Sequence, residues 1–133
     1  MVTSAYHAEI TAKLEEGAVE AVIACGGESA SLRRVASPGA FELVPIAAAL
    51  AERDDIDGVV VLGCIVRGET RHDRVLGLSV AQALAHLAAT QVKPVTFGVL
   101  TVDRLRQARE RCGGAHGHKG REAMVAAIAE GDG

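Results

Sequence analysis

The sequence predicts an α/β protein, built as a three-layer α/β/α sandwich around a short parallel sheet. Stretches in which apolar residues recur at helical spacing alternate along the chain with short apolar stretches of strand type. One of the latter, residues 58–66, is continuously apolar and rich in Val, which suits a strand that helices bury on both faces. Alternation of this kind implies right-handed crossovers between parallel strands. No linker or repeat interrupts the 133 residues, so we expect a single domain over 1–133.

In the first half of the chain, before residues 58–66, the sequence predicts two helices and one strand. Residues 8–25 carry apolar side chains every three or four positions, and two glycines follow as a helix stop. Residues 31–36 are the next strand candidate, and the turn SPGA follows them. A helix then runs through IAAALAER, and Pro45 is expected in its first turn, where proline loses no helical hydrogen bond.

The second half of the chain continues the alternation. Helical spacing predicts a helix over residues 74–90, and residues 94–100, PVTFGVL, are the next strand. Asp103 is expected to cap a helix that ends at Cys112, because aspartate accepts hydrogen bonds from the free N–H groups at a helix start. A Gly- and His-rich loop then leads to a last helix at about 120–130.

Composition and charge exclude several classes of protein. The chain is 49% hydrophobic but only 2% aromatic, and its formal net charge of -3 gives no basis for binding nucleic acid or an anionic membrane. Its apolar runs are too short to cross a bilayer, and its start lacks the pattern of a signal peptide, so a cytoplasmic location is expected. The three cysteines are too few and too scattered for a disulfide framework or a zinc site, and reduced thiols are expected.

Candidate functional residues follow the predicted strands at their carboxyl ends, where ligands bind in open α/β sheets. His72 comes just after residues 58–66, and histidine is the residue type best suited to give and take protons near neutral pH. Gly68 permits a tight turn, Thr70 adds a hydroxyl, and N–H groups at the start of the next helix suit an anion. A lone histidine is more often an ordinary surface residue, and Glu69 can be an ordinary solvated carboxylate. The density of polar groups in GETRHDR favours a site.

A second group of candidates lies near the last helix. Arg111 can grip phosphate oxygens in pairs, and His116 and Lys119 can join it. Most arginines of RLRQARER are nevertheless expected on a solvated helix face. A zinc site formed by His72, His116 and His118 matches no established ligand spacing.

Two aromatic residues are harder to assign. Phe41 and Phe97 are expected in the core by residue type, yet Phe41 follows the turn PGA, where a core side chain is unusual. Glu42 beside it can accept hydrogen bonds from a heterocycle. Residue types and spacing thus indicate a pocket at the strand ends with a proton shuttle and an anion site, and they specify no substrate.

Five motifs, in the same order along the chain, resemble one family: PGAFEL, GCIVRGETRH, PVTFGVLT, QARER and GHKGREA. The chain is similar to the 6,7-dimethyl-8-ribityllumazine synthases (lumazine synthases) from about residue 4 to residue 130. The resemblance implies a flavodoxin-like strand order. It also implies a transferase of riboflavin biosynthesis that condenses 5-amino-6-ribitylaminouracil with 3,4-dihydroxy-2-butanone 4-phosphate and needs no metal or redox cofactor.

The resemblance also implies a role for each candidate. His72 matches the family's general acid/base histidine. The positions that match phosphate-binding residues are Glu69, Thr70, Arg111, His116 and Lys119. The positions that match residues around the pyrimidine and its ribityl chain are Tyr6, Ala40, Phe41, Glu42, Cys64, Ile65, Val66 and Phe97, the last of which a neighbouring subunit supplies.

The family's assembly gives a further expectation. Its members place the active site between subunits, and five subunits form a ring. Some members build twelve rings into an icosahedral shell of sixty subunits. The loop GGAHGHKG is short here, which favours a shell over a free homopentamer. Riboflavin synthase is a further candidate partner.

Two stretches differ from the family pattern. Arg71 replaces a common proline, and Asp73 and Arg74 follow the histidine, so the loop that we expect to carry His72 is unusually charged. Only residues 1–5 precede the first aromatic one, so the first strand is expected to be truncated. Two alternatives follow: a catalytically weak shell or assembly protein with the same fold, and a related transferase such as an archaeal-type riboflavin synthase, whose motifs match less well.

Overall fold

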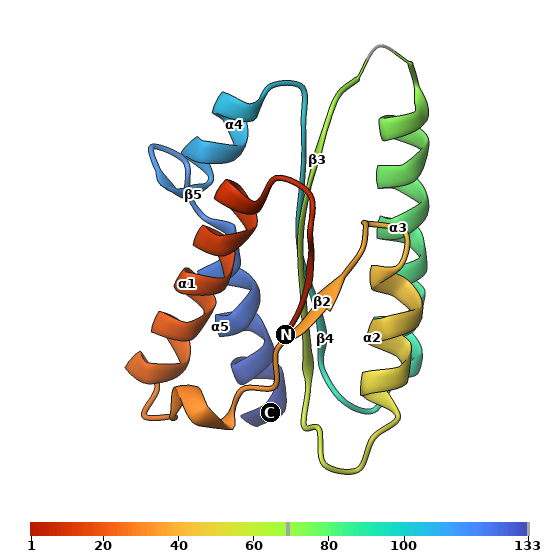
Figure 1. The fold of residues 1–133 in the computed structure, drawn as a ribbon. Helices are drawn as coiled ribbons and strands as arrows, with labels where there is room; N and C mark the ends of the chain where they lie inside the picture. The colour runs from red at the N-terminus through yellow and green to blue at the C-terminus, as the bar shows by residue number, and fades with distance from the viewer. Residues whose placement is uncertain (69, 133) are drawn as a thin grey trace.

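The computed structural model describes residues 1–68 and 70–132 (Figure 1). The elements follow in the order β1 (Val2–Ser4), α1 (Ala8–Ala24), a 3₁₀ turn (Ser29–Ser31), β2 (Val35–Ser37), α2 (Leu43–Ala51), β3 (Val59–Val66), α3 (His72–Thr90), β4 (Val95–Val102), α4 (Leu105–Glu110), β5 (Cys112–Gly114), β6 (Gly117–His118) and α5 (Lys119–Asp132). Strands and helices alternate through most of the chain, as the sequence predicts.

Four strands form one sheet in the order β2-β1-β3-β4, and each neighbouring pair is parallel. β3 and β4 pair along their whole length, from Val59 opposite Val95 to Val66 opposite Val102. β1 has only 3 residues and lies between β2 and β3. The predicted fold class is therefore confirmed, including the short first strand.

The helices divide between the two faces of the sheet. α1 and α5 cover one face, and α2 and α3 cover the other (Figure 1). Successive side chains of a strand point to opposite faces, so β3 contributes to both cores. Leu62 packs with Ile10 and Leu14 of α1, whereas Val61 packs with Leu43 of α2. The prediction that this apolar run is buried on both faces is confirmed.

α1 and α5 pack closely because a glycine stands at their contact. A Cβ atom placed on Gly120 would collide with the main-chain carbonyl group of Leu14 and would lie 2.7 Å from Leu14 Cα. A side chain at this position would push the two helices apart, so the contact depends on glycine. A Cβ atom on Gly17 of α1 would collide instead with the imidazole ring of His118, which belongs to β6.

α4 differs from its sequence prediction. It spans Leu105–Glu110 and its N-cap is Arg104, so the prediction that Asp103 caps this helix is wrong. The side-chain carbonyl oxygen of Gln107 accepts hydrogen bonds from the N–H groups of Asp103 (2.9 Å) and Arg104 (3.0 Å). The free N–H groups at the helix start thus find their acceptor in a side chain of the same helix. The Asp103 carboxylate does not cap the helix and can interact elsewhere.

The Gly- and His-rich segment, expected as a loop, contains the antiparallel hairpin of β5 and β6. Gly113 and Gly117 have φ angles of 109° and 88°, which glycine adopts without strain. The predicted strand at 31–36 is only partly correct, because β2 begins at Val35. Pro45 lies in the first turn of α2, as expected. No helix within the described ranges is both long enough and apolar enough to span a bilayer.

Candidate active site

A groove of ≈ 820 Å³ lies at the carboxyl end of the sheet, beside the segment that joins β3 to α3. Residues of α3 and β4 contribute most of its lining. The polar part of this lining includes three arginines, Arg67, Arg71 and Arg74, and the apolar part includes Leu78 and Phe97. Asp73 and Asp103 also line it, so the groove combines a charged rim, in which arginines outnumber aspartates, with an apolar wall.

His72 is the first residue of α3, so the prediction that it lies in a loop is wrong. Thr70 explains the early start of the helix: its Oγ1 accepts a hydrogen bond from the His72 N–H at 3.2 Å, which satisfies one of the free donors at the helix start. The His72 side chain is exposed, so its imidazole is open to a bound molecule. Glu69, the other predicted member of this segment, lies outside the described residues.

The ends of β3 and β4 are linked through Arg67. Its N–H donates a hydrogen bond to the carbonyl oxygen of Val102 at 2.8 Å, and its Nη1 lies 3.9 Å from Asp103 Oδ1. Both charged side chains are exposed, so the ion pair contributes little to stability. Its main effect is to place one positive and one negative charge beside the groove. Sequence reasoning selected neither residue for the site, and it assigned Asp103 to the cap of the following helix.

Tyr6 and Phe41 are exposed at the ends of β1 and β2. Their exposed fractions are 68% and 63%, which is high for aromatic side chains. A Cβ atom on Gly39 would lie 3.7 Å from Tyr6 Cε2 and 3.3 Å from Glu42 Oε2, so the ring and the carboxylate approach each other over this glycine. Ala40 is buried beneath this surface. An open aromatic ring beside a hydrogen-bond acceptor suits a heterocycle.

The last residues of β3 offer main-chain groups only. Cys64 and Ile65 have buried side chains, and Val66 is partly buried. Burial, and to a smaller extent the neighbouring Cys112, raises the pKa of the Cys64 thiol to about 11. The thiol is therefore neutral near pH 7 and is unsuited to act as a nucleophile. A ligand at this strand end would meet its N–H and C=O groups.

Arg111, His116 and Lys119 come together where α4 meets the β5–β6 hairpin. Arg111 Nη1 donates to the carbonyl oxygen of Gln107 at 2.9 Å, and the Lys119 N–H donates to the carbonyl oxygen of Arg111 at 2.8 Å. The His116 N–H donates to the carbonyl oxygen of Glu110 at 2.8 Å, and its Nε2 lies 3.6 Å from Glu110 Oε2. The structure thus brings three of the predicted phosphate-binding residues together and adds Glu110, which sequence reasoning missed.

Within one chain this cationic cluster (Arg111, His116 and Lys119) lies apart from His72. Figure 1 shows α4 and β5 on the side of the sheet that α1 covers, and α3 on the opposite side. Among the described residues, no hydrogen bond or ion pair joins the cluster to Thr70 or His72. Within one chain, the residue predicted to transfer protons is therefore separate from the cluster predicted to bind phosphate.

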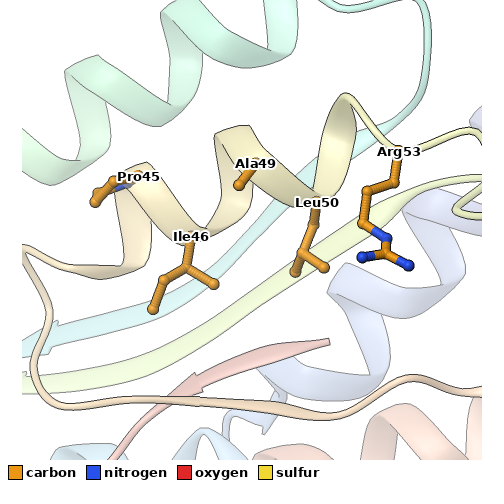
Figure 2. A pocket seen from close by; sticks show the side chains of 5 residues that line it. All are labelled: Pro45, Ile46, Ala49, Leu50 and Arg53. Carbon is orange, nitrogen blue, oxygen red and sulfur yellow. The ribbon is translucent and has the colours of Figure 1, made fainter.

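A further hollow, of ≈ 440 Å³, lies along α2. Figure 2 shows the five side chains that line it, which are those of Pro45, Ile46, Ala49, Leu50 and Arg53. Four of the five side chains are apolar, and none is a histidine or a carboxylic acid, so the hollow suits packing and not acid–base chemistry. Within residues 1–68 and 70–132, no group of three His, Cys, Asp or Glu side chains is placed to hold a metal ion.

Comparison with known proteins identifies the family. The family model for 6,7-dimethyl-8-ribityllumazine synthase matches residues 1–130. The 6,7-dimethyl-8-ribityllumazine synthase of Aquifex aeolicus is 39% identical over 128 residues, which cover 96% of this chain and 83% of that protein. The corresponding protein of Thermus thermophilus is 42% identical over 123 residues, covering 92% and 78%. That of Helicobacter pylori is 41% identical over 128 residues, covering 96% and 82%. The resemblance read from the five motifs is confirmed: this chain belongs to the 6,7-dimethyl-8-ribityllumazine synthase family.

Proposed function

We propose that this chain is an active transferase of riboflavin biosynthesis. It condenses 5-amino-6-ribitylaminouracil with 3,4-dihydroxy-2-butanone 4-phosphate to 6,7-dimethyl-8-ribityllumazine, as a single domain and without a metal or redox cofactor. The observation that carries the proposal is the family match over residues 1–130, which includes every described candidate residue. The carboxyl ends of the strands, where ligands bind in such sheets, support it by holding most of the polar candidates.

His72 is the proposed acid/base group. The amine of the pyrimidine adds to the ketone and water leaves to give an imine; phosphate is then eliminated, and ring closure releases a second water. Each of these steps moves protons at pH values close to neutrality, which a histidine can do in both directions. An exposed imidazole on the first turn of a long helix is held in place by its backbone and remains open to substrate.

The surface formed by Tyr6, Phe41 and Glu42 is the proposed binding site for the pyrimidine. Stacking on Tyr6 and Phe41 would cover apolar ring surface that is otherwise in water. The Glu42 carboxylate can accept hydrogen bonds from ring N–H groups or from ribityl hydroxyls. The main-chain groups of residues 64–66 supply further donors and acceptors. Holding the amine here beside the ketone turns a bimolecular encounter into a local reaction.

The phosphate of the second substrate is proposed to bind the cationic cluster together with Glu69 and Thr70. The Arg111 guanidinium uses one N–H for Gln107, so other N–H groups remain for phosphate oxygens. Because one chain holds the cluster apart from His72, a complete site requires two neighbouring subunits. Phe97 is likewise proposed to complete the site of a neighbour.

A homopentamer is the proposed assembly, with an icosahedral shell of such rings as its larger form. Val75 and Leu78 of α3 are 61% and 56% exposed, and the α2 hollow of Figure 2 is mostly apolar. These surfaces suit burial against further copies of the chain. Sedimentation velocity of the purified protein is expected to show a pentamer or a multiple of it. A monomer over the working concentration range would contradict this proposal.

We further propose a cytoplasmic location and riboflavin synthase as a partner.

The deciding experiment is lumazine formation, followed by absorbance, from the two substrates and the purified protein. Product formation that depends on both substrates would support the proposed enzyme. A folded and assembled protein that forms no product would favour the alternative, a catalytically weak assembly protein with the same fold.

Arg111→Ala is expected to raise the KM for the butanone phosphate on the order of tenfold to a hundredfold, because a charged hydrogen-bond donor to phosphate is lost. The KM for the pyrimidine is expected to change little. Initial rates with each substrate varied in turn measure both constants. Arg34→Ala, which removes an exposed arginine at the other end of the sheet, is the matched control. Equal increases in both KM values would argue against a phosphate role for Arg111.

A further inference from the structure

We propose that Glu110 is a positioning residue that holds Arg111 and His116 together as one binding unit for the substrate phosphate. This inference rests on the proposed function, because Arg111 and His116 have a phosphate to bind only there. Glu110 itself would not touch the substrate. It would act by fixing where the Arg111 and His116 side chains point.

The Glu110 carboxylate lies close to both the Arg111 guanidinium and the His116 ring. Its Oε2 lies 3.8 Å from Arg111 Nη1 and 3.6 Å from His116 Nε2. Its Oε1 lies 3.8 Å from Arg106 Nε, on the same helix. The Glu110 side chain is 33% exposed, so these charges face each other at the edge of the protein and not in bulk water.

The main chain around Glu110 is fixed as well. Its carbonyl oxygen accepts the hydrogen bond from the His116 N–H, so one residue engages His116 through both its main chain and its side chain. A Cβ atom on Gly114 would lie 2.8 Å from Glu110 Cα, which shows that the hairpin packs directly on the last turn of α4. The turn that carries His116 is therefore held directly against the residue that carries the carboxylate.

A carboxylate in this position has two opposing effects on phosphate binding. It repels the phosphate, and it fixes the two side chains that bind the phosphate. The separations of 3.6 and 3.8 Å are longer than direct hydrogen bonds, so the Arg111 guanidinium and the His116 ring keep donors for a ligand. Without the carboxylate, the two side chains would sample other rotamers, and binding would have to order them. We infer that the orienting effect is the larger, because guanidinium binds phosphate in a fixed planar geometry.

The test compares Glu110→Gln and Glu110→Asp with two controls. Glu9→Gln removes a nearby exposed carboxylate that pairs with Arg109 at 2.8 Å, and Arg106→Gln removes the third partner of Glu110. Glu110→Gln is expected to raise the KM for the butanone phosphate about 3- to 10-fold and to leave the KM for the pyrimidine within about twofold. The inhibition constant of inorganic phosphate is expected to rise in parallel. Glu110→Asp is expected to recover part of the loss, and both controls are expected to match the wild type.

An unchanged or lowered KM for the butanone phosphate in Glu110→Gln would overturn the inference, since it would mean that repulsion equals or exceeds the orienting effect. Calorimetric titration with inorganic phosphate separates this inference from the proposed function. If the wild type forms no lumazine yet binds phosphate more tightly than Glu110→Gln, the proposed function fails and the positioning role stands. Equal phosphate affinity in the two proteins, or no binding by either, would overturn the positioning role.

Discussion

Gly120→Ala is expected to destabilise the protein by about 3 kcal/mol, the upper end of the usual cost of overpacking a core. The new methyl group would collide with the main-chain carbonyl group of Leu14 and lie 2.7 Å from Leu14 Cα. Backbone atoms cannot rotate away as a flexible side chain can, so α1 and α5 would have to separate and leave gaps in the core. Urea unfolding followed by circular dichroism measures the change in the free energy of unfolding.

Gly131→Ala is the matched control, because it adds the same methyl group to the same helix. Its nearest neighbour would be Pro94 Cγ at 3.9 Å, an ordinary contact. This variant is expected to match the wild type or to gain up to about 1 kcal/mol from helix propensity. A Gly120→Ala protein as stable as Gly131→Ala would mean that α1 and α5 are farther apart than the structure places them.

His72→Ala is expected to lower kcat by about 100-fold or more, the usual contribution of a general acid/base group. The fold is expected to survive, because the side chain is exposed and the Thr70 hydrogen bond uses the main-chain N–H of residue 72. Absorbance-monitored lumazine formation gives the rate, and circular dichroism confirms that the variant is folded.

His86→Ala is the control for this substitution, since His86 is an exposed histidine near the other end of the same helix. It is expected to keep the wild-type rate. A rate for His72→Ala that equals the rate of His86→Ala would remove His72 from the mechanism, whatever the family match.

The fold could be predicted from the sequence where burial restricts which residue types occur. The Val-rich run of β3 has no polar face because helices cover both of its sides, and this is visible without any knowledge of the partners. Apolar periodicity predicts the start of α3 two residues late, because residues 71–74 are all polar and show no such periodicity. The cap of α4 depends on the side chain of Gln107, and a reciprocal hydrogen bond of this kind leaves no pattern in the sequence.

The candidate site could be predicted only in part. Arg111, His116 and Lys119 are close in sequence, so their grouping followed from a single tight turn. Glu110 was missed because a carboxylate among arginines on a helix is usually solvated. The relation between this cluster and His72 could not be predicted from physical reasoning on one chain, since no contact among the described residues connects them.

The contact between α1 and α5 also determines when the protein can finish folding during its synthesis. α1 comes from Ala8–Ala24 and α5 from Lys119–Asp132, whereas the elements of the opposite layer and their strands lie between them in the chain. As the chain leaves the ribosome, α2, α3 and the sheet can assemble before α5 has been translated. Ile10 and Leu14 can pack against Leu62 of β3 earlier, but the part of α1 that Gly120 contacts stays uncovered until α5 has been made. The nascent chain therefore keeps this part of α1 uncovered until α5 has left the ribosome, and a pause in translation before that point would prolong its exposure to aggregation and to chaperones.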